Sequence, residues 1–420
     1  MLRFSQRPIE DVDINTLRIA LMNYIVSKQR NEDFVIRIED IDQEKNIEGK
    51  DAEIIALLDL FDIKYREVLY SSKGFRFHQA MAIDLLHRKK AFNCFCDLKD
   101  PDVKYDGTCE NLPAEEVIDN PNPFRVRMKK PLSPISFMDR IKGKLTFSPE
   151  EIDSIMILKE DKTPTYIFAS AVDDMLNDIS VVIRDEDSVL DTPKQIYIRQ
   201  QIGYDKEIEY AHVPSLVNNE GKKIDGNDTI GNLKWLLEEG FLPQAISNYL
   251  ISIGTSTPQA IFTIDEAIEW FDLEKVSSSV VVFDLESLRM INKEHLRRLD
   301  DKELSRYIGF ADSEIGKLAK LYLDEVSTTK QLKEKIAPVF APKKLPEALE
   351  ENAQIVRKII NDAPYFEDFE SFKTYLLERS TFKEEELLKI LQFLFTGRES
   401  ALELQSVYEA IKNYIKEIIK

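Results

Sequence analysis

The chain has 420 residues, enough for about three domains of ordinary size, and 43% of them are hydrophobic, which excludes a wholly disordered protein. The 76 acidic and 57 basic residues give a formal net charge of −19, which excludes a uniformly basic protein that coats nucleic acid but not a local basic path. No stretch of about 18 apolar residues could span a membrane, and the N-terminus lacks the apolar core of a secretory signal. We therefore expect a cytoplasmic protein with no membrane partner.

The N-terminal segment predicts a strand–helix–strand unit. A strand is expected at residues 2–4 and a buried strand at 34–38, with a helix from Ile14 between them for which Asp13 is the N-cap. Such a unit begins a parallel sheet, in which ligands lie beyond the carboxyl ends of the strands. This places a candidate site at the segments that follow the two strands.

The rest of the chain changes character twice. An insertion that is rich in strands and turns is expected to separate two halves of the sheet, and amphipathic helical periods dominate from about residue 285. A proline-rich break is expected to divide this helical region into two bundles. The predicted segments are helices at 51–61 and 77–89, the insertion at 92–150, a strand at 178–184, a helix at 192–203, a polar loop at 217–228 and the break at 337–346.

All three cysteines fall within sixteen positions, as Cys94, Cys96 and Cys109. Three thiolates in a turn-rich segment suit a tetrahedral zinc ion, with Tyr105, an aspartate or water as the fourth ligand. The alternative is three small core residues that cluster by chance. So few cysteines in so long a chain argue against a disulfide scaffold.

A second cluster follows the strand at 34–38, where alternation puts Arg37 and Glu39 on one face. At the carboxyl edge of a sheet a glutamate can bind an ammonium group and an arginine a carboxylate. Arg3 and Arg184 end two other predicted strands, so Arg3, Glu39 and Arg184 form a candidate pocket for an acidic amino acid. Ordinary ion pairing between strands is the alternative, and for Arg37 alone it is the preferred interpretation.

The sequence has no glycine-rich phosphate loop of the GxGxxG or Walker A type. Its four histidines lie inside predicted elements, where a structural role is the common one. No nucleophile paired with a histidine stands out. Phosphate chemistry would therefore need some other arrangement.

Nine collinear segments together resemble glutamyl-tRNA synthetase, a class I aminoacyl-tRNA synthetase. The resemblance implies an α/β fold, with a Rossmann-type catalytic core, an acceptor-stem insertion of the zinc type and an all-α anticodon-binding region. The segments are RF at 3–4, LRIALMNYIVSKQ at 17–29, RIEDID at 37–42, CFC…Y…C at 94–109, PTYIFASAVDDM at 164–175, VVIRDED at 181–187, TPKQI at 192–196, EYAHVP at 209–214 and GNLKWLLEEGFLPQAISNYLISIG at 231–254.

The same resemblance implies five parts of the chain. They are the first half of the core at 1–90, the insertion at 91–160, the second half of the core at 161–215, a signature loop with a stem-contact region at 216–285, and the helical region at 286–420. It also implies that Arg3, Glu39, Tyr166 and Arg184 line the glutamate pocket, and all four residue types are retained.

The two signature motifs of the family are altered. The first reads about RFAPSPTG and then HIGN, whereas this chain has RFSQRPIEDVDINT at 3–16, so that Asp13 replaces a histidine and Asn15 a glycine. The second, KMSKR, falls on 223–227: Lys223 is retained, Asp225 replaces serine and Gly226 replaces the second lysine. The lost groups are those that would stabilise phosphate charge, and losing one such donor typically costs about 10²–10³ in rate.

Three functions are compatible with these features. The first is a degenerate paralogue that binds tRNA(Glu) or tRNA(Gln), and glutamate, but activates glutamate poorly or not at all. The second is an active glutamate–tRNA ligase with atypical signatures, in which case ATP is a co-substrate. The third is a scaffold or regulator of an active synthetase or amidotransferase complex, which would suit a chain of net charge −19.

Overall fold

A computed structural model describes residues 1–96, 104–399 and 402–420. The chain divides into two compact units, and each is described by itself. Unit 1 comprises Met1–Leu233 and Ser247–Asp284, and unit 2 comprises Lys234–Ile246 and Leu285–Lys420. Among these residues the structure has no helix long and apolar enough to cross a bilayer.

Unit 1 is organised around a sheet to which seven of the described strands belong, in the order β3-β2-β1-β9-β10-β6-β7. All neighbours are parallel except β6 and β7. The two halves of the sheet meet where β1 pairs with β9, as the predicted split core requires. The strands are β1 (Leu2–Gln6), β2 (Phe34–Ile38), β3 (Val68–Tyr70), β6 (Ile135–Asp139), β7 (Gly143–Phe147), β9 (Val181–Asp185) and β10 (Glu209–Val213).

The four predicted helices of this part of unit 1 lie within about two residues of the expected positions, whereas the helices at 166–176 and 264–270 were not predicted. Asp13 caps the first one, α1, by accepting a hydrogen bond from the Thr16 amide at 2.8 Å. Gly203, with φ of 94°, ends α7 in the left-handed conformation that glycine adopts without strain. The helices are α1 (Ile14–Gln29), α2 (Lys50–Leu60), α3 (Phe75–His87), α6 (Tyr166–Leu176), α7 (Asp191–Ile202) and α10 (Ile264–Trp270).

The segment that interrupts the core is partly continuous with the sheet, which the sequence did not show. Its hairpin β6–β7 extends the sheet because β6 pairs with β10. The remainder forms a separate three-stranded antiparallel sheet. Its elements are β4 (Ala91–Cys94), α4 (Ala114–Ile118), β5 (Arg125–Met128), α5 (Pro149–Ile152) and β8 (Met156–Leu158).

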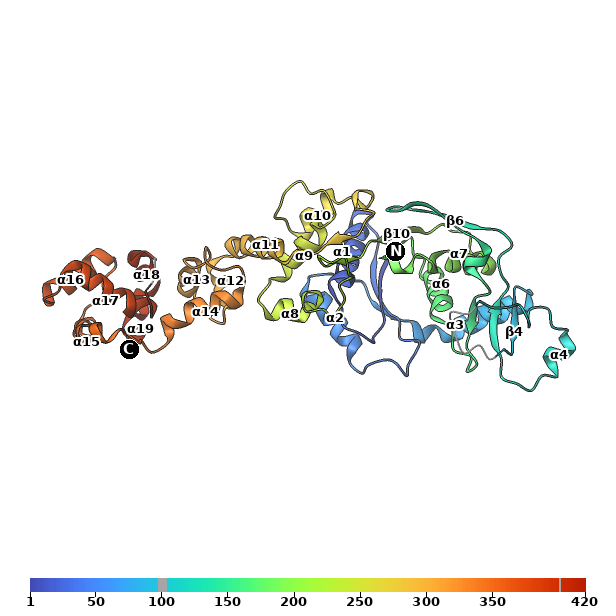
Figure 1. Ribbon diagram of the computed structural model, residues 1–420, viewed down its shortest axis with the longest axis horizontal. Coiled ribbons are helices and arrows are strands. Elements are labelled where there is room, and N and C mark those ends of the chain that lie inside the picture. Colours follow the sequence, from blue (N-terminus) through green and yellow to red (C-terminus); the bar gives the residue numbers. More distant parts are fainter. Residues whose placement is uncertain (97–103, 400–401) are drawn as a thin grey trace. The chain divides into compact units, whose positions relative to one another are not determined.

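Unit 2 is built of helices (Figure 1). The predicted break is confirmed, although α14 continues to Phe340 through Pro338. The prediction of two separate bundles is wrong, because buried residues on both sides of the break, such as Leu332 and Val356, belong to one hydrophobic cluster. The helices are α11 (Leu285–Arg298), α12 (Asp301–Tyr307), α13 (Ser313–Lys320), α14 (Thr329–Phe340), α15 (Glu347–Asp362), α16 (Phe369–Arg379), α17 (Glu384–Thr396), α18 (Leu404–Ile411) and α19 (Ile415–Ile418); α8 (Leu233–Glu238) and α9 (Pro243–Ser252) lie where the chain passes between the units.

A buried ion cluster joins the two halves of the core. Asp174 of α6 is fully buried and accepts two hydrogen bonds from Arg3 of β1, at 2.8 and 3.2 Å, and one from Arg37 of β2 at 2.6 Å. Arg37 also donates to Glu39 at 3.0 Å and to Ser170 at 2.8 Å. Arg37 thus forms structural ion pairs, as preferred, but its partners lie on α6 and directly after its own strand and not on a neighbouring strand. Burial alone would raise the pKa of Asp174, but Arg3 and Arg37 hold it far below its usual range.

We predict that Asp174→Asn destabilises unit 1 by about 3–5 kcal/mol, because it leaves the buried Arg3 without a carboxylate partner among the described residues and Arg37 with Glu39 alone. Since the folded-state pKa of Asp174 is depressed, this stabilisation is present at neutral pH and is lost only as the pH falls below about 4. Urea unfolding at pH 7 measures the change.

The matched control is Asp84→Asn, which removes the carboxylate of α3 that forms a surface pair with Arg88, the residue after the helix. This change should cost less than about 1 kcal/mol. Equal effects of the two substitutions would contradict the assigned role of Asp174.

Candidate functional site

A cavity of about 600 Å³ lies at the carboxyl edge of the sheet, at the junction of β1 and β9 where ligands of open α/β sheets bind. The loop after β1, the start of α1, the end of β9 and the loop at 223–227 form its walls. All nine residues predicted for the amino-acid and nucleotide sites line this one cavity: Arg3, Asp13, Asn15, Glu39, Tyr166, Arg184, Lys223, Asp225 and Gly226.

One half of the cavity carries charges of both signs on buried side chains. Arg3 and Glu39 are 4% and 9% exposed, and the ion cluster around Asp174 fixes both in place. The negative charge of Glu39 raises the pKa of Tyr166 to about 12, while Arg184 and Arg3 act in the opposite direction. This half can therefore bind a ligand that carries an ammonium group and a carboxylate.

Arg184 of β9 is buried without a carboxylate partner among the described residues. Its Nε donates to His212 at 3.3 Å and its Nη2 to Thr192 at 2.5 Å, whereas its Nη1 makes no hydrogen bond within that part of the chain. Burial lowers the pKa of Arg184. Because an unpaired buried charge is costly, this guanidinium group is suited to an anionic group supplied by a ligand.

In the other half, the one lysine retained from the second signature is already neutralised. Lys223 pairs with Asp187 at 2.5 Å and with Asp185 at 3.2 Å. Burial would lower the pKa of Lys223, but the two aspartates raise it above its ordinary value. The ammonium group is thus held by the protein's own carboxylates.

The replaced signature residues have structural partners of their own. Asn15 donates to the Ile224 carbonyl and accepts from the Leu216 amide, both at 2.7 Å, and so binds the loop to the start of α1. Asp13 caps α1, and burial raises its pKa. An added Cβ at Gly226 would lie 3.7 Å from the Cβ of Asp13, an ordinary contact, so a side chain fits there.

Carboxylates outnumber cations in this half of the cavity. A negative potential repels a polyphosphate where a nucleotide site must attract it. The carboxylates are Glu10, Asp11, Asp13, Asp185, Asp187 and Asp225, and the cations are Arg7 and Lys223.

The three cysteines converge away from the cavity. The Sγ atoms of Cys94, Cys96 and Cys109 lie within 4.8 Å of one another, and those of Cys96 and Cys109 are 3.4 Å apart. Ligand sulfurs about 2.3 Å from a tetrahedral zinc are separated by about 3.8 Å, so the three thiols fit such an ion. Tyr105 lies beside them, and its hydroxyl accepts a hydrogen bond from the Cys109 amide at 2.6 Å. The aspartates of 97–103 lie outside the described residues.

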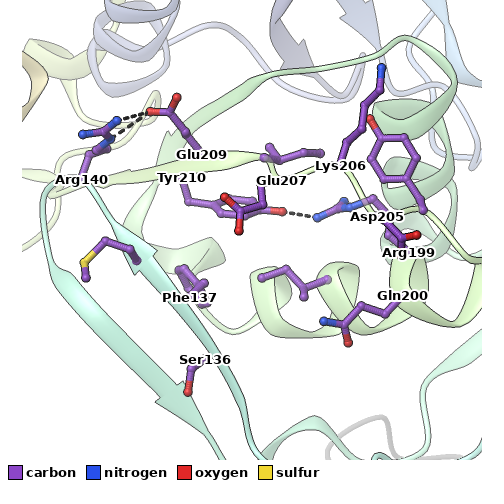
Figure 2. A pocket seen from close by; sticks show the side chains of 14 residues that line it. Ser136, Phe137, Arg140, Arg199, Gln200, Asp205, Lys206, Glu207, Glu209 and Tyr210 are labelled. Atoms are coloured by element: carbon purple, nitrogen blue, oxygen red, sulfur yellow. Dashed lines mark hydrogen bonds and ion pairs between the residues drawn. The ribbon is translucent and has the colours of Figure 1, made fainter.

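A second cavity of about 540 Å³ lies between α7, β10 and β6 (Figure 2). Arg199 extends from α7 to the hydroxyl of Tyr210, and Arg140 pairs with Glu209 at its rim. The ring of Tyr210 stacks on His212, with centroids 6.5 Å apart. Tyr210 thus connects this cavity to His212, which accepts a hydrogen bond from Arg184.

Four residues of the site escaped the sequence analysis: Asp139, Asp174, Thr192 and His212. Three of them belong to segments that carried the resemblance, namely PTYIFASAVDDM, TPKQI and EYAHVP. A search for polar residues inside apolar elements would have singled out Asp174 and His212. Asp139 gave no signal, because only the pairing of β6 with β10 brings it to the site.

Comparisons with known proteins agree with this geometry. The family model "tRNA synthetases class I (E and Q), catalytic domain" matches residues 1–290. The chain is 55% identical to glutamate–tRNA ligase 2 of Sulfurimonas denitrificans and 48% identical to glutamate–tRNA ligase 1 of Nitratiruptor sp., with 100% of each chain covered. It shares its fold with a crystal structure of a glutamate tRNA ligase from Elizabethkingia meningosepticum in complex with its amino acid, with a TM-score of 0.83, 22% identity, and 99% and 97% of the two chains covered. The chain therefore belongs to the class I tRNA synthetases of the E and Q group.

Proposed function

We propose that this protein is a degenerate cytoplasmic glutamyl-tRNA synthetase paralogue that binds glutamate and tRNA(Glu) or tRNA(Gln) but activates glutamate poorly or not at all. The observation that carries the proposal is the pairing of Lys223 with Asp185 and Asp187 beside Asp13. The amino-acid half of the cavity keeps an unpaired cation, while the nucleotide half has its cation neutralised and its remaining walls acidic.

The amino-acid half supports glutamate as the ligand. Arg184 would bind the side-chain carboxylate, since its Nη1 has no partner in the described chain and its charge is uncompensated. Glu39 would bind the α-ammonium group, and Arg3 and Tyr166 complete the lining. Charge-assisted hydrogen bonds of this kind are shorter and stronger than neutral ones.

The nucleotide half opposes activation. Attack of glutamate on the α-phosphate of ATP needs positive groups to stabilise the developing charge. A carboxylate about 4 Å from a phosphate oxygen at a surface-like dielectric costs about 4 kcal/mol before screening. Asp13 and Asp225 introduce such charges, and Lys223 would have to leave two aspartates before it could reach a phosphate.

An active glutamate–tRNA ligase is the second candidate. It is favoured by the 55% identity, over the full length, to a relative that bears that name. ATP would then be its co-substrate, bound by residues other than the altered signatures. The two candidates differ in ATP–pyrophosphate exchange.

We predict that the unmodified protein shows no useful glutamate-dependent ATP–pyrophosphate exchange, with or without tRNA. Asp13→His alone should restore little, because groups that act on one transition state are not additive. Replacing both 5–16 and 223–227 by the family signatures should restore exchange, since Gly226 has room for a side chain.

A charge control belongs in the same assay. Glu220→Lys adds positive charge to the same loop, but Glu220 is exposed and does not line the cavity, so it should restore nothing. Charging of tRNA(Glu) by the unmodified protein at about 1 per second or faster would overturn the proposal.

Binding of tRNA makes a separate prediction. Phosphate contacts release counterions, so the affinity for tRNA(Glu) or tRNA(Gln) should fall at least about tenfold between about 50 and 200 mM salt. Filter binding across this range measures the slope, with a tRNA of unrelated anticodon as the control. No binding at low salt would remove tRNA from the proposed function.

The cysteine cluster is proposed to hold zinc, with Tyr105 as the nearest candidate for the fourth ligand. We predict about one zinc per chain by elemental analysis. The zinc content of Cys96→Ser should be much lower, because a thiolate ligand is removed. Tyr105→Phe is the matched control: it keeps the ring and tests whether the hydroxyl is a ligand. Well under one zinc in the unmodified protein would contradict the assignment.

A further inference from the structure

A series of hydrogen bonds ends on Arg184, which lines the cavity at the carboxyl edge of the sheet. The backbone amides of Ile141 and Lys142 donate to Asp139 at 2.9 and 2.8 Å. Asp139 also lies 2.6 Å from Nδ1 of His212, whose Nε2 lies 2.9 Å from the Thr192 hydroxyl and accepts from Arg184 Nε at 3.3 Å. The Thr192 hydroxyl accepts from Arg184 Nη2 at 2.5 Å.

The hydrogen bonds that connect Asp139, His212, Thr192 and Arg184 have one consistent set of donors and acceptors. Asp139 is a carboxylate that can only accept, and hydrogen bonding to His212 opposes the effect of burial to keep its pKa low. His212 must therefore carry its proton on Nδ1, which leaves Nε2 as an acceptor. The Thr192 hydroxyl accepts from Arg184, so its own proton is free to point at Nε2.

We infer that Asp139, His212 and Thr192 are positioning residues that set the specificity of the amino-acid pocket by orienting Arg184 without neutralising it. Both groups that Arg184 contacts are uncharged oxygen or nitrogen acceptors. An acidic partner in their place would fix the guanidinium group equally well but would cancel its charge. Because two nitrogens are held by neutral groups, Nη1 and the full positive charge remain for the carboxylate of the ligand.

The surroundings of His212 favour the neutral ring. Burial lowers its pKa, Asp139 opposes this, and Arg184 and Lys142 add to the lowering. The ring is confined by Phe137 and Tyr210, with centroids at 6.1 and 6.5 Å. Figure 2 shows these two aromatic residues and the Arg199 side chain that supports Tyr210 from α7. Phe137 and Tyr210 also line the second cavity, so the imidazole lies next to residues of its wall.

This inference rests on the proposed glutamate pocket for its functional half, so the test has two readouts. The first is independent of any ligand: ¹⁵N spectra of the four histidines in the full chain, with His212 assigned through His212→Gln. We expect the Nδ1–H tautomer at pH 7, and a shift of the Nε2 signal in Thr192→Val, which keeps the shape of the side chain but removes the hydroxyl.

The second readout is calorimetric binding of glutamate and of glutamine. Thr192→Val should weaken the affinity for glutamate about tenfold or more, because a hydrogen bond to a charged group is lost. The affinity for glutamine should fall by no more than about twofold. Thr192→Ser should restore the preference for glutamate. Thr396→Val is the matched control: it removes a buried hydroxyl that donates to the Gln392 carbonyl in unit 2, and it should leave both affinities unchanged.

The outcomes separate the two proposals. An Nε2–H tautomer, or an unchanged glutamate-to-glutamine ratio in Thr192→Val, overturns the positioning role even if glutamate binds the unmodified protein. If the unmodified protein binds no glutamate, the proposed pocket is wrong, and the hydrogen-bonded chain is then decided by the tautomer and its response to Thr192→Val. A loss of thermal stability with no change in the ratio would show a purely structural role.

Discussion

The burial of one carboxylate, Asp174, between Arg3 and Arg37 is the constraint on which the site depends. It ties a helix of the second half of the core to the first two strands, across residues 71–165, which separate β3 from α6 and include the insertion. Removing Asp174 would leave Arg3 buried without a carboxylate partner among the described residues and Arg37 with Glu39 alone. The same cluster fixes Arg3 and Glu39, so the stability of the fold and the shape of the amino-acid pocket have one physical origin.

The two halves of the cavity differ in how their charges are balanced. In the amino-acid half the guanidinium group of Arg184 is oriented by neutral acceptors and remains available to a ligand. In the nucleotide half Lys223 is neutralised by two aspartates, and Asn15 fixes the loop at 216–224 to α1. The altered signature residues thus have hydrogen-bond and ion-pair partners within the protein, which supports the proposed loss of the nucleotide site.

Local pattern predicted α1, α7 and β2, because the cap at Asp13, the glycine after α7 and the alternation of β2 act within a few residues, but α6 and α10 were not predicted. The resemblance also singled out nine of the residues that line the cavity. The ion cluster and the Asp139–His212–Thr192 chain could not be predicted, since their members are separated by up to 171 residues and meet only through strand pairing. The role of the hairpin β6–β7 was missed for the same reason.

The most direct test of the account is a calorimetric titration of one preparation with glutamate and with ATP–Mg²⁺. The different charge balance of the two halves predicts that glutamate binds saturably. ATP should show no saturable binding up to about 1 mM, the upper end of ordinary Michaelis constants. Saturable binding of ATP below that concentration would contradict the proposed loss of the nucleotide site.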